Sequence, residues 1–492
     1  MNKKFLRVLF SMSALLILGK GLGFVRTAMV ASTYGAGFIS DIYSFEDSFI
    51  NEIYTIFATF LACSFIPKYL SLDNDNRNRL FSLILNLGTI LMVLLSIGCL
   101  IFTEPLLKVL VPGYFNLYDI GEIIFVTRVN LIMLILTFLV NYFMTVLQAH
   151  EIFVYLSLES IILNVVVIFY LSFLSNIGLI GLLLCRVFAY IILLLLVIIR
   201  LKKIDSIHYY KIFDLRDRHL HDMFKVAIPM LGITVLWQLN YVIDMSMASG
   251  LESGSIACLN YAKVISMIIY NVVGYVISTY AYPVISKVQN DVQQVSKTFK
   301  EYFFILLNLV MPIAVLTMFF SGYVSKLLYG RGNMAESSVL IIANILVMYL
   351  PGSIAYCLKN LYSKLFYIKK DTKIVLILDV IGCVVNITLN LILVNVLGVY
   401  GLALATSISY CTTVILQLVI GIKKEYVVFS FSEFRNIGLE LILLLMVGKI
   451  SSEMISILPN NEVLKFCYVS VTYILMCILF SFKDLKKLTR KA

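Results

Sequence analysis

The chain has 492 residues, of which 61% are hydrophobic and 14% charged, and its mean hydropathy is +0.97. This composition excludes an ordinary soluble globular domain and predicts an all-α protein that crosses the membrane many times. The formal net charge of +11 fits either a nucleic-acid partner or a membrane protein whose basic loops gather on one face, and the distribution of charge along the chain decides between them.

Apolar runs of about 20 residues, the length that crosses the hydrocarbon core as a helix, divide the sequence into predicted membrane spans. The first run is long and is followed by many more, which favours a retained span over a cleaved secretory signal. The sequence predicts fourteen spans, near residues 5–33, 38–66, 80–103, 121–146, 151–173, 178–199, 226–247, 254–285, 301–320, 338–363, 374–395, 398–422, 437–455 and 464–482.

Lysine and arginine are concentrated in alternate loops between these spans. If the N-terminus is cytoplasmic, 28 of the 39 Lys and Arg residues fall in cytoplasmic segments. Cytoplasmic loops of membrane proteins carry such an excess. We therefore expect both termini in the cytoplasm, an even number of spans and no nucleic-acid partner.

The two halves of the chain resemble each other at an offset of roughly 220 residues. NIGLIGLLL at 176–184 matches NVLGVYGLALA at 395–405, and ASTYGAGFISDIY at 31–43 faces ASGLESGSIACLNY at 248–261. A repeat of six spans keeps its direction, so we predict two parallel six-helix lobes. The predicted organisation is an N-lobe at 1–199, a cytoplasmic linker at 200–225, a C-lobe at 226–422, two further spans at 437–482 and a basic cytoplasmic tail at 483–492.

The first predicted span contains charges and glycines that indicate transport. Lys20 and Arg26 lie inside this apolar run, where a charge is costly unless it faces protein or trapped water. The glycines at positions 19, 21 and 23 predict a bend or break that lines a cavity. On an unbroken helix the two cations would lie about 120° apart.

Polar side chains form stripes on the second, seventh and eighth predicted spans. A polar face on a membrane helix meets protein or water, and these helices are the ones expected at the interface between two lobes. The stripes contain Asp41, Ser44, Ser48, Glu52, Thr55 and Thr59 in span 2, Asn240 and Asp244 in span 7, and Lys263, Ser266, Tyr270 and Gly274 in span 8.

The cations in these spans suit an anionic substrate. If Lys20, Arg26 and Lys263 converge, they form a site for a phosphate or diphosphate, which Arg binds as a fork and Lys as a point charge. The alternative is that these cations only pair with acidic neighbours and hold the helices together.

The acidic residues on the stripes are candidates for carrying a coupling ion, a proton or Na⁺. They are Asp41, Glu52 and Asp244, and a purely structural salt bridge is the alternative role. Glu46 and Asp47 point away from the stripe and are expected near the outer surface. For the remaining arginines inside spans, 128 and 186, the expected role is to reach the interface or to pair within their own lobe.

Motifs for catalysis and metal binding are absent from the sequence. The nine cysteines form no CxxC pair and the four histidines no HExxH. The GxGxG around Lys20 follows no predicted strand, and there is no Walker A motif. We therefore expect a transporter without catalytic residues, metal, ATP or another cofactor, driven by an ion gradient, the membrane potential or substrate asymmetry.

Six segments occur in order along the chain: GLGFVRTAMVASTYGAGFISD, TVLQAHEIF, QLNYVIDMSMASGLESGSIACLNYAK, LLYGRGNMAESS, LFYIKKDTK and NVLGVYGLALATSIS. In order and spacing they resemble the MurJ (MviN) lipid II flippases of the multidrug/oligosaccharidyl-lipid/polysaccharide (MOP) exporter superfamily. The resemblance covers about residues 14–425 and implies a fourteen-helix inner-membrane protein that moves the undecaprenyl-diphosphate-linked peptidoglycan precursor to the outer leaflet.

The resemblance also implies roles for individual residues. Lys20 stands where the family usually has arginine, and Arg26 matches the following arginine, so the family's diphosphate site maps onto them. Asp41 and Asp244 match aspartates of the family. The spans at 437–482 look like the pair that extends the cavity into a groove for the lipid tail, and cell-wall synthesis proteins are the implied partners.

The sequence departs from the family pattern at two places. Tyr54 and Thr55 stand where the family has an arginine pair, and YAKV places the cation at Lys263, one position earlier than in the family's YADR. These departures leave open a flippase for another polyprenyl-linked oligosaccharide, such as an O-antigen, capsule or teichoic-acid unit. A drug antiporter would favour an acidic, aromatic cavity, and a membrane enzyme would need a large outer loop.

Overall fold

The computed structural model describes residues 3–458 and 462–489. Within these residues the chain forms helices and no strand, which confirms the predicted all-α class. Ten of the described helices are long and apolar enough to cross a membrane, or eleven if the bent helix α11 (Arg218–Ser249) counts as one span. Three further long helices, α1, α19 and α20, contain 32, 27 and 28 residues, so the predicted total of fourteen is consistent with the structure.

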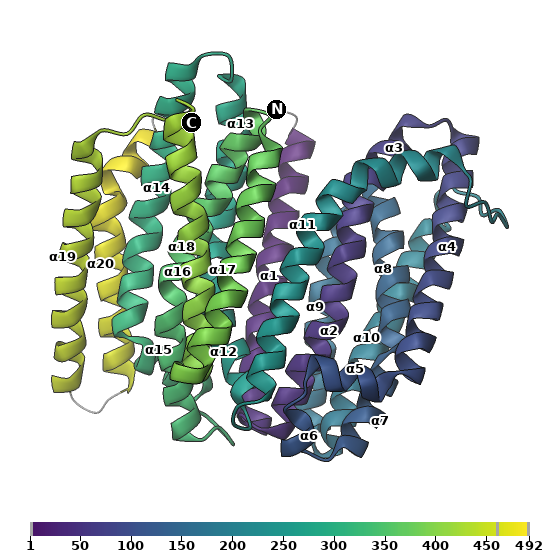
Figure 1. The fold of residues 1–492 in the computed structure, drawn as a ribbon, viewed down its shortest axis with the longest axis horizontal. Helices are drawn as coiled ribbons and strands as arrows, with labels where there is room; N and C mark the ends of the chain where they lie inside the picture. The colour runs from purple at the N-terminus through teal and green to yellow at the C-terminus, as the bar shows by residue number, and fades with distance from the viewer. Residues whose placement is uncertain (1–2, 459–461, 490–492) are drawn as a thin grey trace. The chain divides into compact units, whose positions relative to one another are not determined.

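The first of two compact units contains most of the residues singled out in the sequence. It comprises Met1–Ala257 with Arg331–Met334, and its long helices lie side by side (Figure 1). Its elements are α1 (Lys3–Tyr34), α2 (Phe38–Phe60), the π-helical turn Leu61–Phe65, α3 (Ile66–Ser71), α4 (Asn74–Ile101), α5 (Thr103–Leu110), α6 (Tyr114–Leu117), α7 (Ile120–Asn130), α8 (Ile132–Ala149), α9 (Val154–Phe173), the 3-10 turn Ser175–Ile177, α10 (Gly178–Leu201), α11 and the first turn of α12 (Ser255–Ile269).

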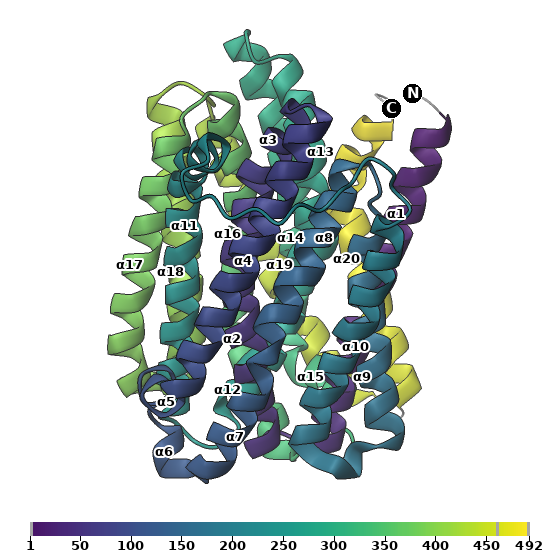
Figure 2. The same cartoon turned by 90° about the vertical axis from the view of Figure 1, so that its right-hand side faces the viewer.

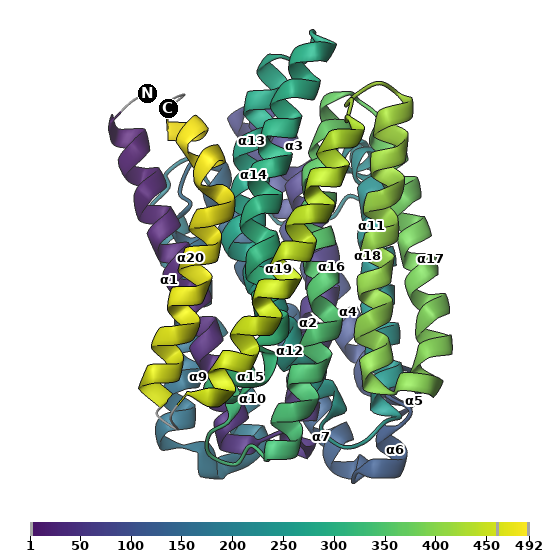
Figure 3. The ribbon, with the colours of Figure 1, turned by 90° about the vertical axis from the view of Figure 1, so that its left-hand side faces the viewer.

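The second unit comprises Cys258–Gly330 with Ala335–Ala492. Its helices α19 and α20 pack against α14 (Figure 3), where Thr317 and Tyr473 hydroxyls lie 2.7 Å apart. Its elements are the rest of α12, the π-helical turn Tyr270–Gly274, α13 (Tyr275–Lys287), α14 (Val292–Phe319), α15 (Ser321–Tyr329), α16 (Glu336–Ile368), α17 (Thr372–Leu397), α18 (Val399–Lys423), α19 (Phe431–Ile457) and α20 (Glu462–Thr489).

The predicted basic tail at 483–492 is helical where the structure describes it, because α20 continues to Thr489. Residues 490–492 lie outside the described residues. Helix α11, which the sequence assigns to the C-lobe, packs against α2 and belongs to the first compact unit. The division into two lobes of six helices stays a prediction.

Helix α1 runs unbroken from Lys3 to Tyr34, so its glycines do not break the helix as predicted. The glycines instead allow α9 to approach closely. A Cβ atom at Gly19 would lie 3.0 Å from Ser160 Oγ, and one at Gly23 would lie 3.3 Å from Asn164 Nδ2. Asn164 Nδ2 also donates a hydrogen bond of 3.1 Å to the carbonyl of Gly19. Small residues are what membrane helices use to bring their backbones together.

The glycines of the internal repeat have the same conformation in both halves. Gly178 is the first residue of α10 and has φ 74° and ψ −149°, and Gly398 immediately precedes α18 with φ 57° and ψ −134°. These positive φ angles favour glycine over any other residue. Three residues later, a Cβ at Gly181 would collide with the Tyr170 hydroxyl and one at Gly401 with the Leu393 carbonyl, so each glycine lets two consecutive helices pack tightly. This local geometry supports the predicted duplication.

Two long helices of the first unit depart from a regular, straight α-helix. The parts of α11 before and after position 229 differ in direction by 55°, and the residue there is proline, which has no backbone N–H for the helix ladder. The helix of the second span contains the π-helical turn Leu61–Phe65, a feature that is frequent at functional sites.

The predicted linker at 200–225 is held along α4 rather than free. Three polar side chains of α4 are spaced four residues apart and therefore share one face of the helix. Asn78 Oδ1 accepts a hydrogen bond from the backbone N–H of His208, Ser82 Oγ from that of Tyr210, and Asn86 Nδ2 donates to the carbonyl of Ile212. Figure 2 shows the segment after α10 as an extended chain that crosses the side of α4.

Candidate functional site

The polar stripe predicted on the second span faces α11. Ser48 Oγ lies 3.0 Å from the Tyr241 hydroxyl, and the Thr59 and Thr234 hydroxyl oxygens lie 3.3 Å apart. Both contacts join α2 to α11. The expectation that this stripe meets protein is therefore confirmed.

Two of the predicted coupling acids lie on these two helices, which pack against each other. Glu52 of α2 and Asp244 of α11 both interact electrostatically with the Tyr241 hydroxyl. Asp41 precedes Glu52 by eleven residues, which is about 16 Å along a helix that rises 1.5 Å per residue. The structure thus brings Glu52 and Asp244 to one region and places Asp41 in another.

Asp41 accepts hydrogen bonds at the start of α12. Its carboxylate is 2% exposed and accepts from the backbone N–H groups of Gly254 at 2.7 Å and Ala257 at 2.8 Å, and from the Tyr118 hydroxyl at 2.8 Å. The first N–H groups of a helix have no partner within the helix and attract negative charge. Asp41 therefore caps α12, and its role in ion coupling stays a prediction.

Arg26, Asp47 and Arg186 form an ion cluster inside the first unit. One carboxylate oxygen of Asp47 accepts a short hydrogen bond from Arg186 Nη2, and the other lies 3.8 Å from Arg26 Nη2. The Arg186 side chain is 2% exposed, that of Arg26 17% and that of Asp47 21%. Two guanidinium groups share one carboxylate, so these three side chains together carry one positive charge.

The expectation that Glu46 and Asp47 lie near the outer surface is wrong. Glu46 is fully buried and accepts hydrogen bonds from Thr127 Oγ1 at 2.5 Å and Asn130 Nδ2 at 2.7 Å. Asp47 belongs to the ion cluster. Helical spacing predicted a single polar face on α2, directed toward one partner helix. In the structure α2 packs against several helices, α7, α8, α10 and α11.

Arg186 forms an ion pair within the first unit, which is one of the two roles expected for it. The sequence pattern alone did not identify Asp47 as its partner, although an arginine in the middle of an apolar span needs an acidic partner at a similar depth. That requirement is the signal that could have found the cluster. The second such arginine, Arg128, places Nε 3.4 Å from Thr103 Oγ1.

The three predicted cations have different surroundings. Lys20 is exposed on α1 and makes no ion pair within the described residues. Because α1 is unbroken, Lys20 and Arg26 lie about 120° apart around it. Lys263 is half-buried on α12 in the second unit. The convergence of all three cations stays a prediction.

Part of the polar stripe on the eighth span packs inside the second unit. The rings of Tyr270 and Tyr356 meet edge to face with centres 4.6 Å apart, and a Cβ at Gly274 would collide with Cys357 Sγ. Both partners lie on α16. The second unit also contains a buried ion pair between Lys359 and Asp379, with 2.6 Å between Nζ and Oδ1.

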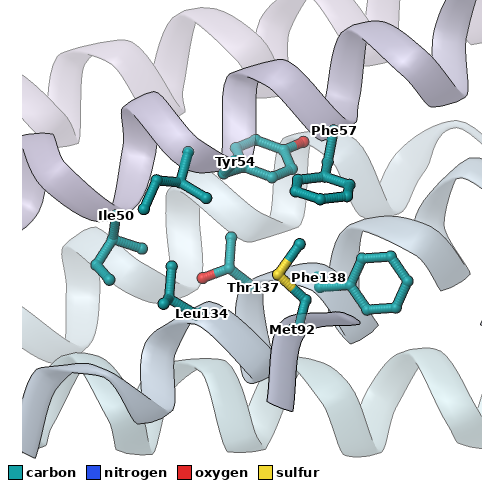
Figure 4. Close-up of a pocket in the computed structure, with 8 residues that line it drawn as sticks. Ile50, Tyr54, Phe57, Met92, Leu134, Thr137 and Phe138 are labelled. Atoms are coloured by element: carbon teal, nitrogen blue, oxygen red, sulfur yellow. The ribbon is translucent and has the colours of Figure 1, made fainter. Parts of the chain in front are cut away.

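A small pocket between α2, α4 and α8 does not suit an anion (Figure 4). Six of its eight lining residues have purely apolar side chains, and the others are Tyr54 and Thr137. The Tyr54 hydroxyl donates to Asn141 Oδ1 at 2.7 Å, so it already has a partner. The pocket is an apolar packing gap in the core of the first unit. Within the described residues, no group of three or more His, Cys, Asp or Glu side chains could hold a metal ion.

The fold is that of a multi-span membrane transporter. It matches a solved structure named "Lipid II flippase MurJ, inward closed conformation" with a TM-score of 0.82, 22% identity and coverage of 97% of this chain and 99% of that one. It also matches an inward-facing multidrug resistance MATE family transporter of the MOP superfamily, with a TM-score of 0.70, 15% identity and coverage of 82% and 94%.

The sequence then identifies the family within this class. The family model described as "Lipid II flippase MurJ" matches residues 30–473, so the chain belongs to the MurJ family. A probable lipid II flippase MurJ of Rickettsia prowazekii is 26% identical over 399 residues, which cover 79% of this chain and 78% of the relative. A probable lipid II flippase MurJ of Buchnera aphidicola subsp. Acyrthosiphon pisum is 25% identical over 430 residues, covering 82% and 81%. The resemblance found in the sequence is thereby confirmed.

Proposed function

We propose that this chain translocates lipid II, the undecaprenyl-diphosphate-linked peptidoglycan precursor, across the bacterial cytoplasmic membrane for cell-wall synthesis. The observation that carries the proposal is the family match over residues 30–473. The ion cluster supports it, because a net positive charge inside a membrane protein is costly and marks a functional site.

The proposed mechanism is alternating access between two lobes. Arg26 binds the diphosphate through its planar fork, and Lys20 and Lys263 contribute point charges. The hydroxyl groups on the stripe of α2 offer hydrogen bonds to the sugar. The lipid tail stays in the bilayer, with α19 and α20 as its proposed groove.

Translocation changes no covalent bond, so the chain acts as a transporter and not as an enzyme. We assign Glu52 and Asp244, together with Asp41, to the response to a coupling ion, H⁺ or Na⁺, or to the membrane potential. The mechanism uses no ATP, metal or other cofactor. Both termini lie in the cytoplasm, and the partners are the bilayer, the lipid-linked substrate and cell-wall synthesis proteins.

The proposal is tested by lipid II exposure on the outer leaflet of bacteria depleted of their own flippase. Expression of this chain is expected to restore exposure, and Arg26→Glu is expected to abolish it because the charge that binds the diphosphate is reversed. Each variant is quantified in the membrane fraction, so that lost activity is separated from lost protein. Absence of exposure with an inserted wild-type chain contradicts the lipid II assignment.

A flippase for another polyprenyl-linked oligosaccharide is the second candidate. It is favoured by Tyr54, whose hydroxyl bonds to Asn141 in the core where the family pattern has an arginine. The same depletion assay with O-antigen, capsule or teichoic-acid intermediates separates the two candidates.

A further inference from the structure

We propose that Arg186 is a positioning residue for anion binding: it takes up the charge of Asp47 and thereby leaves Arg26 available to the diphosphate. This inference rests on the proposed function, since it explains how one cation of the substrate site is kept free. It assigns a role to two residues, Asp47 and Arg186, that lie outside the set derived from the sequence and from the family pattern.

The order of burial separates the roles of the two arginines. Arg186 is 2% exposed and makes the closer contact with the carboxylate, whereas Arg26 is 17% exposed and lies 3.8 Å from it. An ion pair of 3.8 Å is too long for a hydrogen bond. Arg186 is therefore the internal counterion of Asp47, and Arg26 is the cation at the accessible edge.

Within the described residues, Asp47 is the acidic side chain that lies within 4 Å of Arg26 and Arg186. Glu46 accepts two hydrogen bonds from Thr127 and Asn130 and interacts electrostatically with Arg186 at longer range. Asn51 donates to Asp47 Oδ1 at 3.2 Å. The Tyr43 ring centre lies 5.7 Å from the Arg186 guanidinium, a distance at which an aromatic ring attracts a cation.

The charge of the cluster gives Arg186 its effect on Arg26. With all three residues present, two positive charges and one negative charge leave one positive charge for an anion. Without Arg186, the half-buried Asp47 has Arg26 as its nearest cation, and a buried carboxylate that loses its partner draws in the remaining one. The cluster would then be neutral, and Arg26 would be held by Asp47 instead of by the substrate.

Binding of inorganic diphosphate to the purified full chain in detergent tests this inference without lipid II. We expect Arg186→Gln to weaken binding about tenfold, since charge-assisted hydrogen bonds to Arg26 are lost. We expect Asp47→Asn to tighten binding about tenfold, because the competing carboxylate is gone. The double variant Asp47→Asn/Arg186→Gln restores the single positive charge and should bind within about threefold of the wild type.

The double variant separates positioning from a structural role. If Arg186 only held the helices together, Arg186→Gln and the double variant would be equally defective, and Asp47→Asn would not bind diphosphate more tightly. Either result overturns the proposal. Arg128→Gln is the matched control, because Arg128 is another arginine inside a span of the same unit, outside the cluster, and should leave diphosphate binding unchanged.

Flipping assays on the same variants distinguish this inference from the proposed function. If the wild type exposes lipid II, Arg186→Gln should reduce exposure about tenfold and the double variant should recover it. If the affinity for diphosphate changes across the variants as expected but the wild type exposes no lipid II, the positioning role of Arg186 holds and the substrate is another diphosphate-linked lipid. If the wild type flips lipid II but the affinity for diphosphate is the same in the wild type and the charge variants, the positioning role of Arg186 is wrong.

Discussion

Asp41 shows how one buried carboxylate can stabilise a helix to which it does not belong. It accepts from two backbone N–H groups at the start of α12 and from Tyr118. Asp41→Ala should lower the free energy of unfolding by about 1–3 kcal/mol, the cost of leaving buried donors unpaired. Tyr118→Phe should cost less, about 0.5–1.5 kcal/mol, since the backbone donors keep their acceptor. Thermal unfolding in detergent measures both, and equal stability of Asp41→Ala and the wild type would contradict the capping role.

A second carboxylate, outside the membrane spans, makes stability depend on pH. Asp371 lies in the turn between α16 and α17, and the hydrogen bonds from Lys424 at 2.7 Å and from Tyr426 lower the pKa of this carboxyl. A lowered pKa in the folded state contributes stability above the pKa of the unfolded state, about 3.9 for Asp. That contribution is lost as the pH falls through the folded value.

Asp371→Asn should therefore remove part of the acid sensitivity of the protein. The midpoint of thermal unfolding, measured from pH 3 to pH 7, should fall less steeply below about pH 4 in this variant than in the wild type. The difference between the two should shrink in 1 M salt, because the site is partly exposed and salt screens it. Parallel curves for the two proteins would show that the contact with Lys424 adds no stability.

The individual charges show where sequence reasoning succeeded and where it failed. The cost of a charge in an apolar run correctly indicated that Arg186 needs a partner, but helical spacing on a single helix could not identify Asp47. Glu46 and Asp47 were misplaced because the prediction gave α2 one polar face, whereas this helix packs against several neighbours. Contacts between helices that are distant in sequence are set by packing, which a single sequence does not show.

At the scale of one element, the glycines of α1 were read correctly as important and wrongly as a break. An isolated glycine weakens a helix, but the apolar face of α1 is packed against α9, and packing overrides the local preference. Gly19 and Gly23 meet α9, whereas a Cβ at Gly21 would meet nothing within 4 Å. The two kinds of position predict opposite effects of substitution.

Gly19→Leu should destabilise the first unit, because the larger side chain collides with Ser160 and separates α1 from α9. Gly21→Ala should instead stabilise it by about 0.5–1 kcal/mol, since alanine favours the helix and the site has space. Thermal unfolding of the two variants provides the comparison. A loss of lipid II exposure in a stable Gly21→Ala protein would favour the hinge predicted from the sequence over the packing role.

The segment at 200–225 shows the same limit of local reasoning. Its charge and position predicted a cytoplasmic linker between two lobes and named no packing partner for it. The structure fixes residues 208, 210 and 212 to polar side chains of α4. The spacing of Asn78, Ser82 and Asn86 along one helix face was visible in the sequence, and only the fold shows that an extended chain lies on that face.

At the scale of the whole molecule, the sequence was most informative. Apolar runs of spanning length predicted the helices, and two glycines matched between the halves, Gly178 and Gly398, have similar backbone angles. These signals are strong because the membrane imposes helix length and internal hydrogen bonding on every span. The predicted convergence of Lys20, Arg26 and Lys263 stays a prediction, because it depends on an arrangement of helices that no local pattern encodes.

The distribution of positive charge along the chain predicts its orientation in the membrane. The segment 200–225 contains seven Lys and Arg residues, and the cost of moving so many positive charges across the membrane should keep it in the cytoplasm. A green fluorescent protein fused to the C-terminus should therefore fluoresce, because this reporter matures inside the cell. Alkaline phosphatase, which is active only outside, should be inactive after Arg216 and active after Lys108 or Arg331. Active phosphatase after Arg216 together with inactive phosphatase after Lys108 would show that the chain has the opposite orientation. In that case substrate would reach Arg26 from the opposite side of the membrane.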